Sequence, residues 1–165
     1  MPHERCRTAR RPGPPGHRVA GFTLIELMIA IAVVALLGAL AYPSFLDAVR
    51  KSRRADGMGA LAAVQQAQER WRNNNANYST SLADLNVPSS SSNGYYTISV
   101  TAEPGGRPLA VAYVATAVGK AGTSQENDKA CRKLSVKLDQ GSLSYAGCGN
   151  CAEFSYAATH ACWAR

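Results

Sequence analysis

An apolar run near the N-terminus, Phe22 to Tyr42, contains a single charged side chain, Glu26. At about 1.5 Å per residue, this run would extend ~31 Å as a helix, which is enough to cross the hydrocarbon core of a bilayer. An ionisable group inside such a span costs roughly 2.5–3.5 kcal/mol at the bilayer centre and less near an end. The run therefore predicts a membrane-spanning helix in which the carboxylate has a function.

A basic leader precedes the apolar run. Residues 1–21 contain five Arg and one Glu and are rich in Pro and Gly, which predicts a cytoplasmic targeting segment. An ordinary secretory signal with a small-residue cleavage site near Ala39-Leu40-Ala41 is the alternative, but such a signal does not require Glu26. Thr23 and Glu26 fit a capping box, which explains an acid near a helix start but not the Gly21-Phe22 junction before it.

The segment GFTLIELMIAIAVVALLGALAYPSF, which begins at Gly21, resembles the N-terminus of type IV pilins and pseudopilins. The phrase from Gln65 to Leu85 is most similar to that of PilE-type minor pilins. The resemblance implies cleavage between Gly21 and Phe22 by a prepilin peptidase, followed by N-methylation of Phe22. Leaders in this family are usually shorter, so whether Met1 is the true start stays open.

The resemblance also implies roles for side chains within the run. Glu26, with Thr23 beside it, is expected to pair with the N-terminal amine of a neighbouring subunit during assembly. Gly38 and Pro43 predict a helix break, because Pro removes one backbone hydrogen bond. In the resembled family, the segment before this Pro can lose helicity when subunits pack into a filament.

The rest of the chain predicts an α+β fold. Ser44 to about Asn73 continues the helix, with an apolar stripe at Ala60, Val64, Ala67 and Trp71. An apolar period of two then predicts four antiparallel strands. Their expected ranges are 95–102, 109–118, 131–138 and 142–146, with turns at 103–106 and 139–141. The expected architecture is a pilin fold, with one long helix packed on this sheet. Its regions are a removed leader (1–21), a transmembrane or filament-core half-helix (22–43) and a globular head (44–165).

Four cysteines, an even number, lie in the last third of the chain: Cys131, Cys148, Cys151 and Cys162. In an exported protein they predict disulfides, and the residues alone leave three connectivities open. The resemblance implies that Cys131 pairs with Cys162, which leaves Cys148 with Cys151. A Cys-x-x-Cys pair also allows a membrane-anchored periplasmic thiol-redox protein as an alternative from another class.

The sequence contains no pattern typical of an enzyme, and it predicts no catalytic residue, metal or cofactor. His160 is the only His after the leader, and a lone His is more often structural. Glu126 and Asp128 lie close in sequence, as acids do in the calcium sites of some secretion pseudopilins, but no further ligands follow. Zinc is disfavoured because Cys148 and Cys151 form only one pair of the required spacing.

Basic residues suggest two further contacts. The formal charge falls from +7 to +3 without the leader, which does not by itself indicate nucleic-acid binding. Lys129, Arg132, Lys133 and Lys137 could form a DNA-binding patch, but strand alternation is expected to divide them between two faces. The cluster from Arg50 to Arg54 could contact lipid headgroups, form ion pairs between subunits or lie on a solvated helix face.

These observations predict a minor pilin of a type IV pilus, acting in pilus biogenesis, adhesion and twitching motility. The precursor is expected in the inner membrane with a cytoplasmic N-terminus, and the mature chain in an extracellular pilus. Expected partners are other pilins, the prepilin peptidase and methyltransferase, the inner-membrane assembly machinery and the bilayer; nucleic acid is not expected. Alternatives are a type II secretion pseudopilin and a DNA-uptake competence pilin. The sequence decides neither the position in the filament nor an adhesion receptor.

Overall fold

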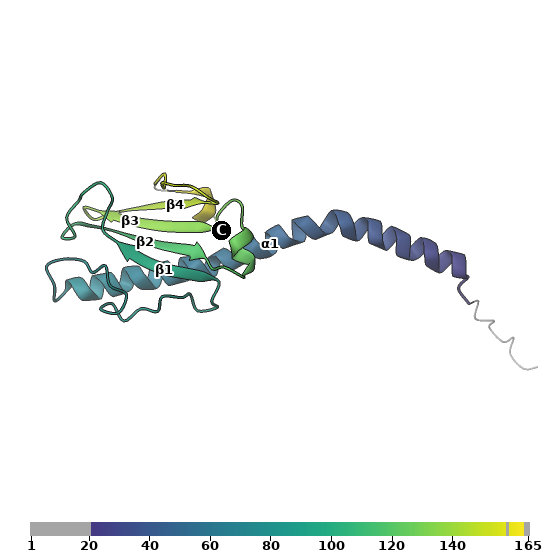
Figure 1. Cartoon of the computed structure of the whole chain (residues 1–165), viewed down its shortest axis with the longest axis horizontal. Coiled ribbons are helices and arrows are strands. Elements are labelled where there is room, and N and C mark those ends of the chain that lie inside the picture. The colour runs from purple at the N-terminus through teal and green to yellow at the C-terminus, as the bar shows by residue number, and fades with distance from the viewer. Residues whose placement is uncertain (1–20, 158, 164–165) are drawn as a thin grey trace, which may run out of the picture. The chain divides into compact units, whose positions relative to one another are not determined.

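The computed structural model describes residues 21–157 and 159–163, so residues 1–20 of the predicted leader lie outside the described part (Figure 1). The described elements, in chain order, are α1 (Leu24–Arg72), β1 (Tyr96–Thr101), β2 (Ala112–Gly119), the 3-10 turn η1 (Ser124–Asn127), β3 (Lys133–Asp139), β4 (Ser142–Cys148) and the 3-10 turn η2 (Ala161–Trp163). The chain divides into two compact units, one ending at Leu40 and the other beginning at Ala41.

Helix α1 is continuous from Leu24 to Arg72 and contains Pro43 in its interior. The predicted break at Gly38 and Pro43 is therefore absent from this structure. Pro43 removes only its own N–H from the hydrogen-bond ladder, and the rest of the ladder allows the helix to continue. The loss of helicity expected in a packed filament concerns another state and stays a prediction.

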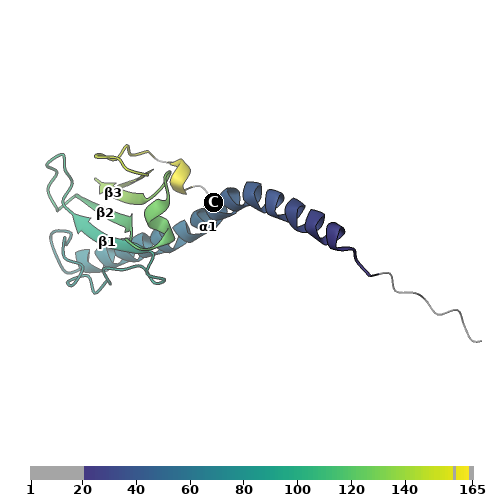
Figure 2. The same ribbon diagram turned by 45° about the vertical axis from the view of Figure 1, so that its right-hand side comes forward.

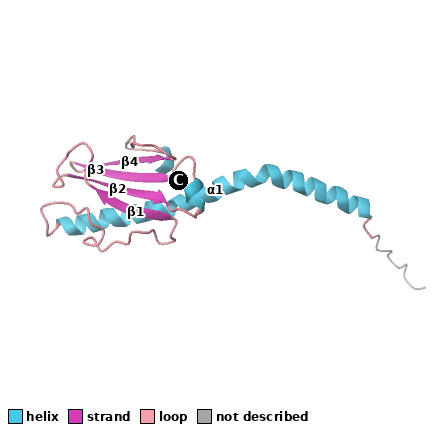
Figure 3. Cartoon of the chain, viewed as in Figure 1, coloured by secondary structure: helices cyan, strands magenta, loops and turns pink. Residues whose placement is uncertain are grey.

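The four strands form one antiparallel sheet in the order β1-β2-β3-β4, as Figure 3 shows; Figure 2 shows β1, β2 and β3 from another side. Each strand pairs with the next in sequence, so the sheet is a meander. The β3–β4 hairpin turns at Gln140 and Gly141, whose φ angles are 49° and 82°. Positive φ at both central residues is typical of the two-residue type I′ turn, whose twist matches that of the flanking strands. The predicted α+β pilin fold is confirmed.

The core of the head lies between the sheet and the C-terminal half of α1. Leu61, Val64 and Ala67 of the helix are buried against alternate residues of three strands. These strand residues are Tyr96, Ile98, Val100, Tyr113, Ala115, Ala117, Leu134, Val136 and Leu138. Each fully buried Leu or Val contributes roughly 1.5–3 kcal/mol. The predicted stripe was correct at Val64 and Ala67, whereas Ala60 and Trp71 are half-buried at its margins.

Gly57 allows the helix to approach strand β1 closely. A Cβ atom at this position would lie 3.0 Å from the Tyr96 ring, and Tyr96 is completely buried. The Tyr96 hydroxyl accepts a hydrogen bond of 2.8 Å from Gln125 Nε2. Because the ring is fixed at both ends, a larger side chain at position 57 would have to displace packed atoms.

The predicted second strand begins too early. Residues 109–111 form a turn, and β2 starts at Ala112. The carbonyl of Pro108 accepts hydrogen bonds from the backbone N–H of Val111 (3.0 Å) and Ala112 (3.2 Å). These short-range bonds compete with strand pairing and delay the start of β2.

The predicted third strand also begins two residues too early, because β3 starts at Lys133 and not at Cys131. Asp128 Oδ1 accepts hydrogen bonds from the backbone N–H of Ala130 (3.2 Å) and Cys131 (3.0 Å). A carboxylate that binds the backbone two and three residues later stabilises a turn in place of an extended strand.

Candidate functional site

The residues at the predicted processing site lead into α1. Gly21, Phe22 and Thr23 precede the helix, and 86% of the Phe22 surface is exposed. Thr23 Oγ1 accepts a hydrogen bond of 3.2 Å from the backbone N–H of Glu26, as an N-cap residue does. The N-cap bond therefore uses the Glu26 backbone and leaves its carboxylate available.

The apolar side chains from Phe22 to Phe45 are exposed throughout this stretch. The least exposed of its large side chains, Val33, still has 50% of its surface accessible. This part of α1 is long and apolar enough to span a membrane, and no residue of its most apolar window is buried within the chain. A continuous apolar surface of this length requires lipid or other apolar helices around it.

Glu26 is the acidic residue of this apolar stretch. None of the ion pairs among the described residues includes it. A carboxylate without a cation in a low-dielectric environment is strongly penalised, so a cation from outside the chain would stabilise it. The geometry is thus suited to an intermolecular ion pair.

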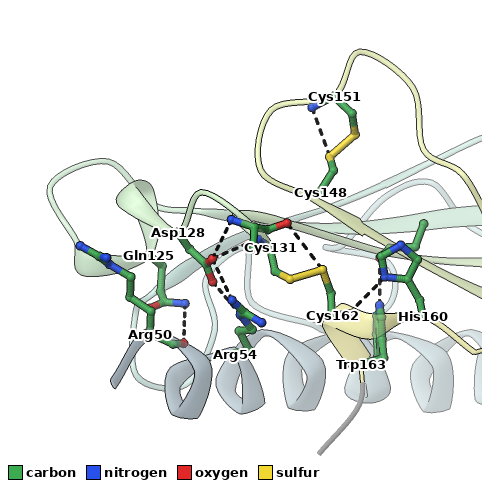
Figure 4. Close-up of a disulfide and its surroundings, with 12 residues drawn as sticks. Arg50, Arg54, Gln125, Asp128, Cys131, Cys148, Cys151, His160, Cys162 and Trp163 are labelled. Carbon is green, nitrogen blue, oxygen red and sulfur yellow. Dashed lines mark hydrogen bonds and ion pairs between the residues drawn. A yellow bond between two sulfur atoms is a disulfide. The ribbon is translucent and has the colours of Figure 1, made fainter. Parts of the chain in front are cut away.

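Two disulfides lie at the end of the sheet where β3 begins and β4 ends (Figure 4). Cys131 is joined to Cys162, and both residues are buried. Cys148 is joined to Cys151, and the carbonyl of Cys151 accepts a hydrogen bond of 3.0 Å from Lys133 Nζ. The first bridge closes a loop of 31 residues, whereas the second closes a separation of three residues.

The Cys131–Cys162 bridge requires a glycine on β4. A Cβ atom at Gly147 would lie 2.6 Å from the Cys162 Cβ atom and 2.7 Å from its sulfur. Trp163, the residue after Cys162, donates a hydrogen bond of 2.9 Å from Nε1 to the carbonyl of Ala146. Its ring packs on the Tyr145 ring, with 4.8 Å between the ring centroids. The C-terminal segment is therefore fixed to β4 by a disulfide, a hydrogen bond and an aromatic contact.

Arg54 and Asp128 form an ion pair that the sequence did not reveal. Arg54 Nε donates to Asp128 Oδ2 at 2.7 Å and Arg54 Nη2 donates to Oδ1 at 2.9 Å. Burial is the largest influence and acts to raise the pKa of Asp128. The hydrogen bonds from Arg54, Cys131 and Ala130, with the charge of Arg54, outweigh it and lower this pKa below its ordinary value. The pair fixes α1 to the turn before Cys131.

Gln125 provides a second link between α1 and the turn η1. Its side chain is completely buried, and Nε2 donates to the carbonyl of Arg50 at 3.2 Å (Figure 4). The same Nε2 also donates to the Tyr96 hydroxyl. At the other end of the head, Gln68 of α1 exchanges two hydrogen bonds with the backbone of Ser79, at 2.6 and 3.0 Å. Gln68 lies on the same buried stripe of α1 as residues 61 and 64. This helical spacing was the signal in the sequence that could have predicted its burial.

The remaining candidates have structural contacts. His160 Nδ1 accepts a hydrogen bond of 3.2 Å from the backbone N–H of Cys162. Glu126 accepts from the backbone N–H of Gly122 at 2.9 Å, so it and Asp128 have different partners. Among the described residues, no group of three or more His, Cys, Asp or Glu side chains could hold a metal ion.

The four residues of the predicted basic patch do not all lie on β3. Lys133 and Lys137 lie on the same face of β3, opposite its core residues, while Lys129 and Arg132 precede the strand. Lys137 Nζ lies 4.9 Å from the centre of the Tyr156 ring and 3.9 Å from a Glu103 carboxylate oxygen. Lys133 and Lys137 are thus occupied within the chain, whereas Lys129 is exposed.

Comparison with known proteins identifies the family. Residues 16–42 match the prokaryotic N-terminal methylation motif, and residues 43–135 match the family described as type IV minor pilin ComP, DNA uptake sequence receptor. The chain is 49% identical over 47 residues to fimbrial protein Q of Moraxella bovis, covering 28% of this chain and 30% of that protein.

Other relatives are pilins as well. The type IV major pilin protein PilA of Myxococcus xanthus (strain DK1622) is 33% identical over 86 residues, covering 52% of this chain and 39% of that protein. The type IV major fimbrial protein FimA of Dichelobacter nodosus is 47% identical over 38 residues, or 23% of this chain and 24% of that protein. The chain thus spans less than two fifths of the length of these relatives. With its helix, sheet and methylation motif, the chain belongs to the type IV pilins, in the ComP minor pilin family.

Proposed function

We propose that this pilin is made as a precursor that is cleaved between Gly21 and Phe22 and N-methylated at Phe22. The precursor lies in the inner membrane with a cytoplasmic N-terminus, and the mature chain is built into a type IV pilus. In the filament, the Glu26 carboxylate pairs with the Phe22 amine of a neighbouring subunit. The filament serves pilus biogenesis, adhesion and twitching motility.

The observation that carries this proposal is the exposed apolar half of α1. Near its start is the carboxylate of Glu26, which is in no ion pair with another residue that the structure describes. The same helix can lie in lipid before assembly and among other apolar helices afterwards, because both environments cover its surface. Glu26 then favours one arrangement of neighbouring subunits, in which its carboxylate lies next to an amine. Other arrangements would leave the carboxylate as an isolated charge in a low-dielectric environment. Regions 22–43 and 44–165 accordingly act as anchor and head.

The N-terminus of the mature protein, measured by mass spectrometry of material from the native cell, tests the proposal. N-methylated Phe22 is the expected result. A retained leader, or a start after Ala41, would exclude processing by the prepilin peptidase and favour a secretory or periplasmic redox protein.

DNA uptake is a second candidate function, because the matching family is described as a receptor for a DNA uptake sequence. Arg132 and Lys129 supply charge near the start of β3 that could contact phosphates. In anisotropy titrations of duplex DNA with the full chain in detergent micelles, affinity is expected to fall steeply as salt rises. Arg132→Gln is expected to weaken binding to all sequences about equally, as a phosphate contact does. Binding that does not respond to salt would argue against this candidate.

A further inference from the structure

A basic pocket of about 640 Å³ lies beside α1, just after the apolar half of the helix. Its charged lining comes from two separate segments, α1 and the turn that follows η1. The lining includes Asp47, Arg50, Lys51, Arg54, Asp128 and Lys129. We refer to it as the basic pocket.

Ion pairing within the basic pocket leaves two positive charges uncompensated. Arg50 pairs with Asp47 at 2.7 Å, and Arg54 pairs with Asp128 at the same distance. Neither Lys51 nor Lys129 is in an ion pair among the described residues, and both are exposed. Two lysines that line one pocket from different segments are suited to bind a phosphate, whose oxygens can accept hydrogen bonds from both ammonium groups.

The basic pocket follows the apolar run along the chain. The apolar run ends at Tyr42, and Arg50 and Lys51 are the first cations after it. Basic residues that follow a membrane span closely lie at the headgroups. In the proposed orientation, with the Phe22 amine at the cytoplasmic surface, these headgroups belong to the outer leaflet.

The lining of the basic pocket changes from apolar to charged along α1, in the direction away from the apolar run. Pro43 and Leu46, the residues nearest the apolar run, supply apolar surface, and the cations begin at Arg50. A phospholipid presents the same order, from apolar acyl chains to charged phosphate. DNA also presents phosphates, but it has no apolar part for Pro43 and Leu46 to contact.

We infer that the basic pocket binds the phosphate of an anionic phospholipid of the outer leaflet while the pilin is anchored in the membrane. Lys51 and Lys129 contact the phosphate. The inference rests on the proposed membrane orientation of the precursor. Because the lipid contacts the head directly, it holds the head at the membrane surface, and this contact breaks when the subunit is extracted into a filament.

Native mass spectrometry of the full mature chain in detergent micelles can test this inference. The chain is titrated with phosphatidylglycerol, phosphatidylcholine, glycerol 3-phosphate or a short DNA duplex. One phosphatidylglycerol is expected to bind in preference to phosphatidylcholine. Replacing Lys51 and Lys129 by Gln is expected to weaken phosphatidylglycerol binding by roughly fivefold for each lysine, since a basic residue at an anionic surface contributes about 1 kcal/mol.

Arg70→Gln with Lys120→Gln is the matched control, because these two exposed cations lie outside the basic pocket and their loss changes the net charge equally. The control is expected to bind phosphatidylglycerol as the parent chain does. An equal loss of phosphatidylglycerol affinity in both double variants would show a general charge effect and overturn the inference. Equal binding of phosphatidylglycerol and phosphatidylcholine by the parent chain would also overturn it. Equal affinity for glycerol 3-phosphate would reduce the basic pocket to a site for free phosphate, and displacement of lipid by the duplex would assign it to DNA.

Flotation with vesicles separates this inference from the proposed function. The full chain is expected to float with vesicles of pure phosphatidylcholine, since anchoring depends on the apolar helix alone. Failure to float with any vesicle would contradict the proposed anchoring. Flotation with all vesicles, together with no lipid preference in the titration, would overturn the inference alone.

Discussion

Arg54 of α1 and Asp128, 74 residues later in the chain, form an ion pair through two hydrogen bonds of 2.7 and 2.9 Å. Side-chain exposure is 14% for Arg54 and 3% for Asp128. The carboxylate also accepts from the backbone of Ala130 and Cys131, so one buried group links the helix to the turn that begins the disulfide loop.

We expect Asp128→Asn to destabilise the head by about 3 kcal/mol, because it leaves a mostly buried guanidinium without its countercharge. The pKa of Asp128 is lowered in the folded state, so its stabilising contribution is present above the unfolded value of about 3.9 and is lost as pH falls through the folded value. Urea unfolding of the full chain at several pH values measures both effects. The difference in unfolding free energy between the parent and Asp128→Asn should become smaller below about pH 4.

Asp47→Asn is the matched control for this prediction. Asp47 pairs with Arg50 on the same helix and its side chain is 76% exposed, so the loss should stay below about 1 kcal/mol. A pH-independent difference between parent and Asp128→Asn would contradict the assigned role of the ion pair.

The two disulfides should contribute unequally to stability. In the chain-entropy model, the 31-residue separation of Cys131 and Cys162 corresponds to about 3.7 kcal/mol, and the three-residue separation of Cys148 and Cys151 to about 1.6 kcal/mol. Replacing each pair by Ala and measuring denaturant midpoints under oxidising conditions checks the order. A larger loss of stability from replacing the Cys148–Cys151 pair would show that this short bridge stabilises contacts outside its own loop.

Substitution of two glycines of α1 by Ala should change the stability of the head in opposite directions. Gly57→Ala places a Cβ atom 3.0 Å from the fixed Tyr96 ring, and overpacking of this kind costs roughly 1–3 kcal/mol. Gly59→Ala meets no atom within 4 Å, so it should gain up to about 1 kcal/mol from helix propensity. Thermal unfolding of the two variants provides the comparison. Equal stabilisation by both would show that Tyr96 can move.

Glu26→Gln should reduce filament assembly by about 100-fold or more, because it removes one partner of the proposed ion pair in low dielectric. Its backbone N–H can still donate to Thr23, so helix formation is unaffected. Pilus yield by electron microscopy, with processing checked by mass spectrometry, is the measurement. Glu69→Gln, an exposed change on the head, serves as the control. Normal pilus yield from Glu26→Gln would exclude the proposed pairing.

The sequence predicted those parts of the fold that have a local, periodic signal. Alternation of apolar residues identified β1 correctly, with Tyr96, Ile98 and Val100 on the buried face. The strand starts near Leu109 and Cys131 were wrong, because backbone N–H groups there bind a nearby carbonyl and a carboxylate. Periodicity contains no information on such competition.

Contacts between distant polar residues were not predictable in the same way. Arg54 and Asp128 have no spacing that links them, and Gln125 reaches α1 from a turn that the pattern did not predict. The residues of the processing site, by contrast, form a short contiguous motif, so Gly21, Phe22 and Glu26 could be named from the sequence. Their roles stay predictions until the mature N-terminus is measured.

Each edge of the sheet forms a bridge with another segment of the chain's own backbone. Ser90 forms a bridge with Thr97 on β1, and Ala157 exchanges hydrogen bonds of 2.8 and 3.0 Å with Tyr145 on β4. An uncovered edge is a template for strand addition by another chain, which leads to irreversible aggregates. Bridges at both edges therefore disfavour association from sheet to sheet and leave the exposed apolar half of α1 as the surface for the proposed assembly.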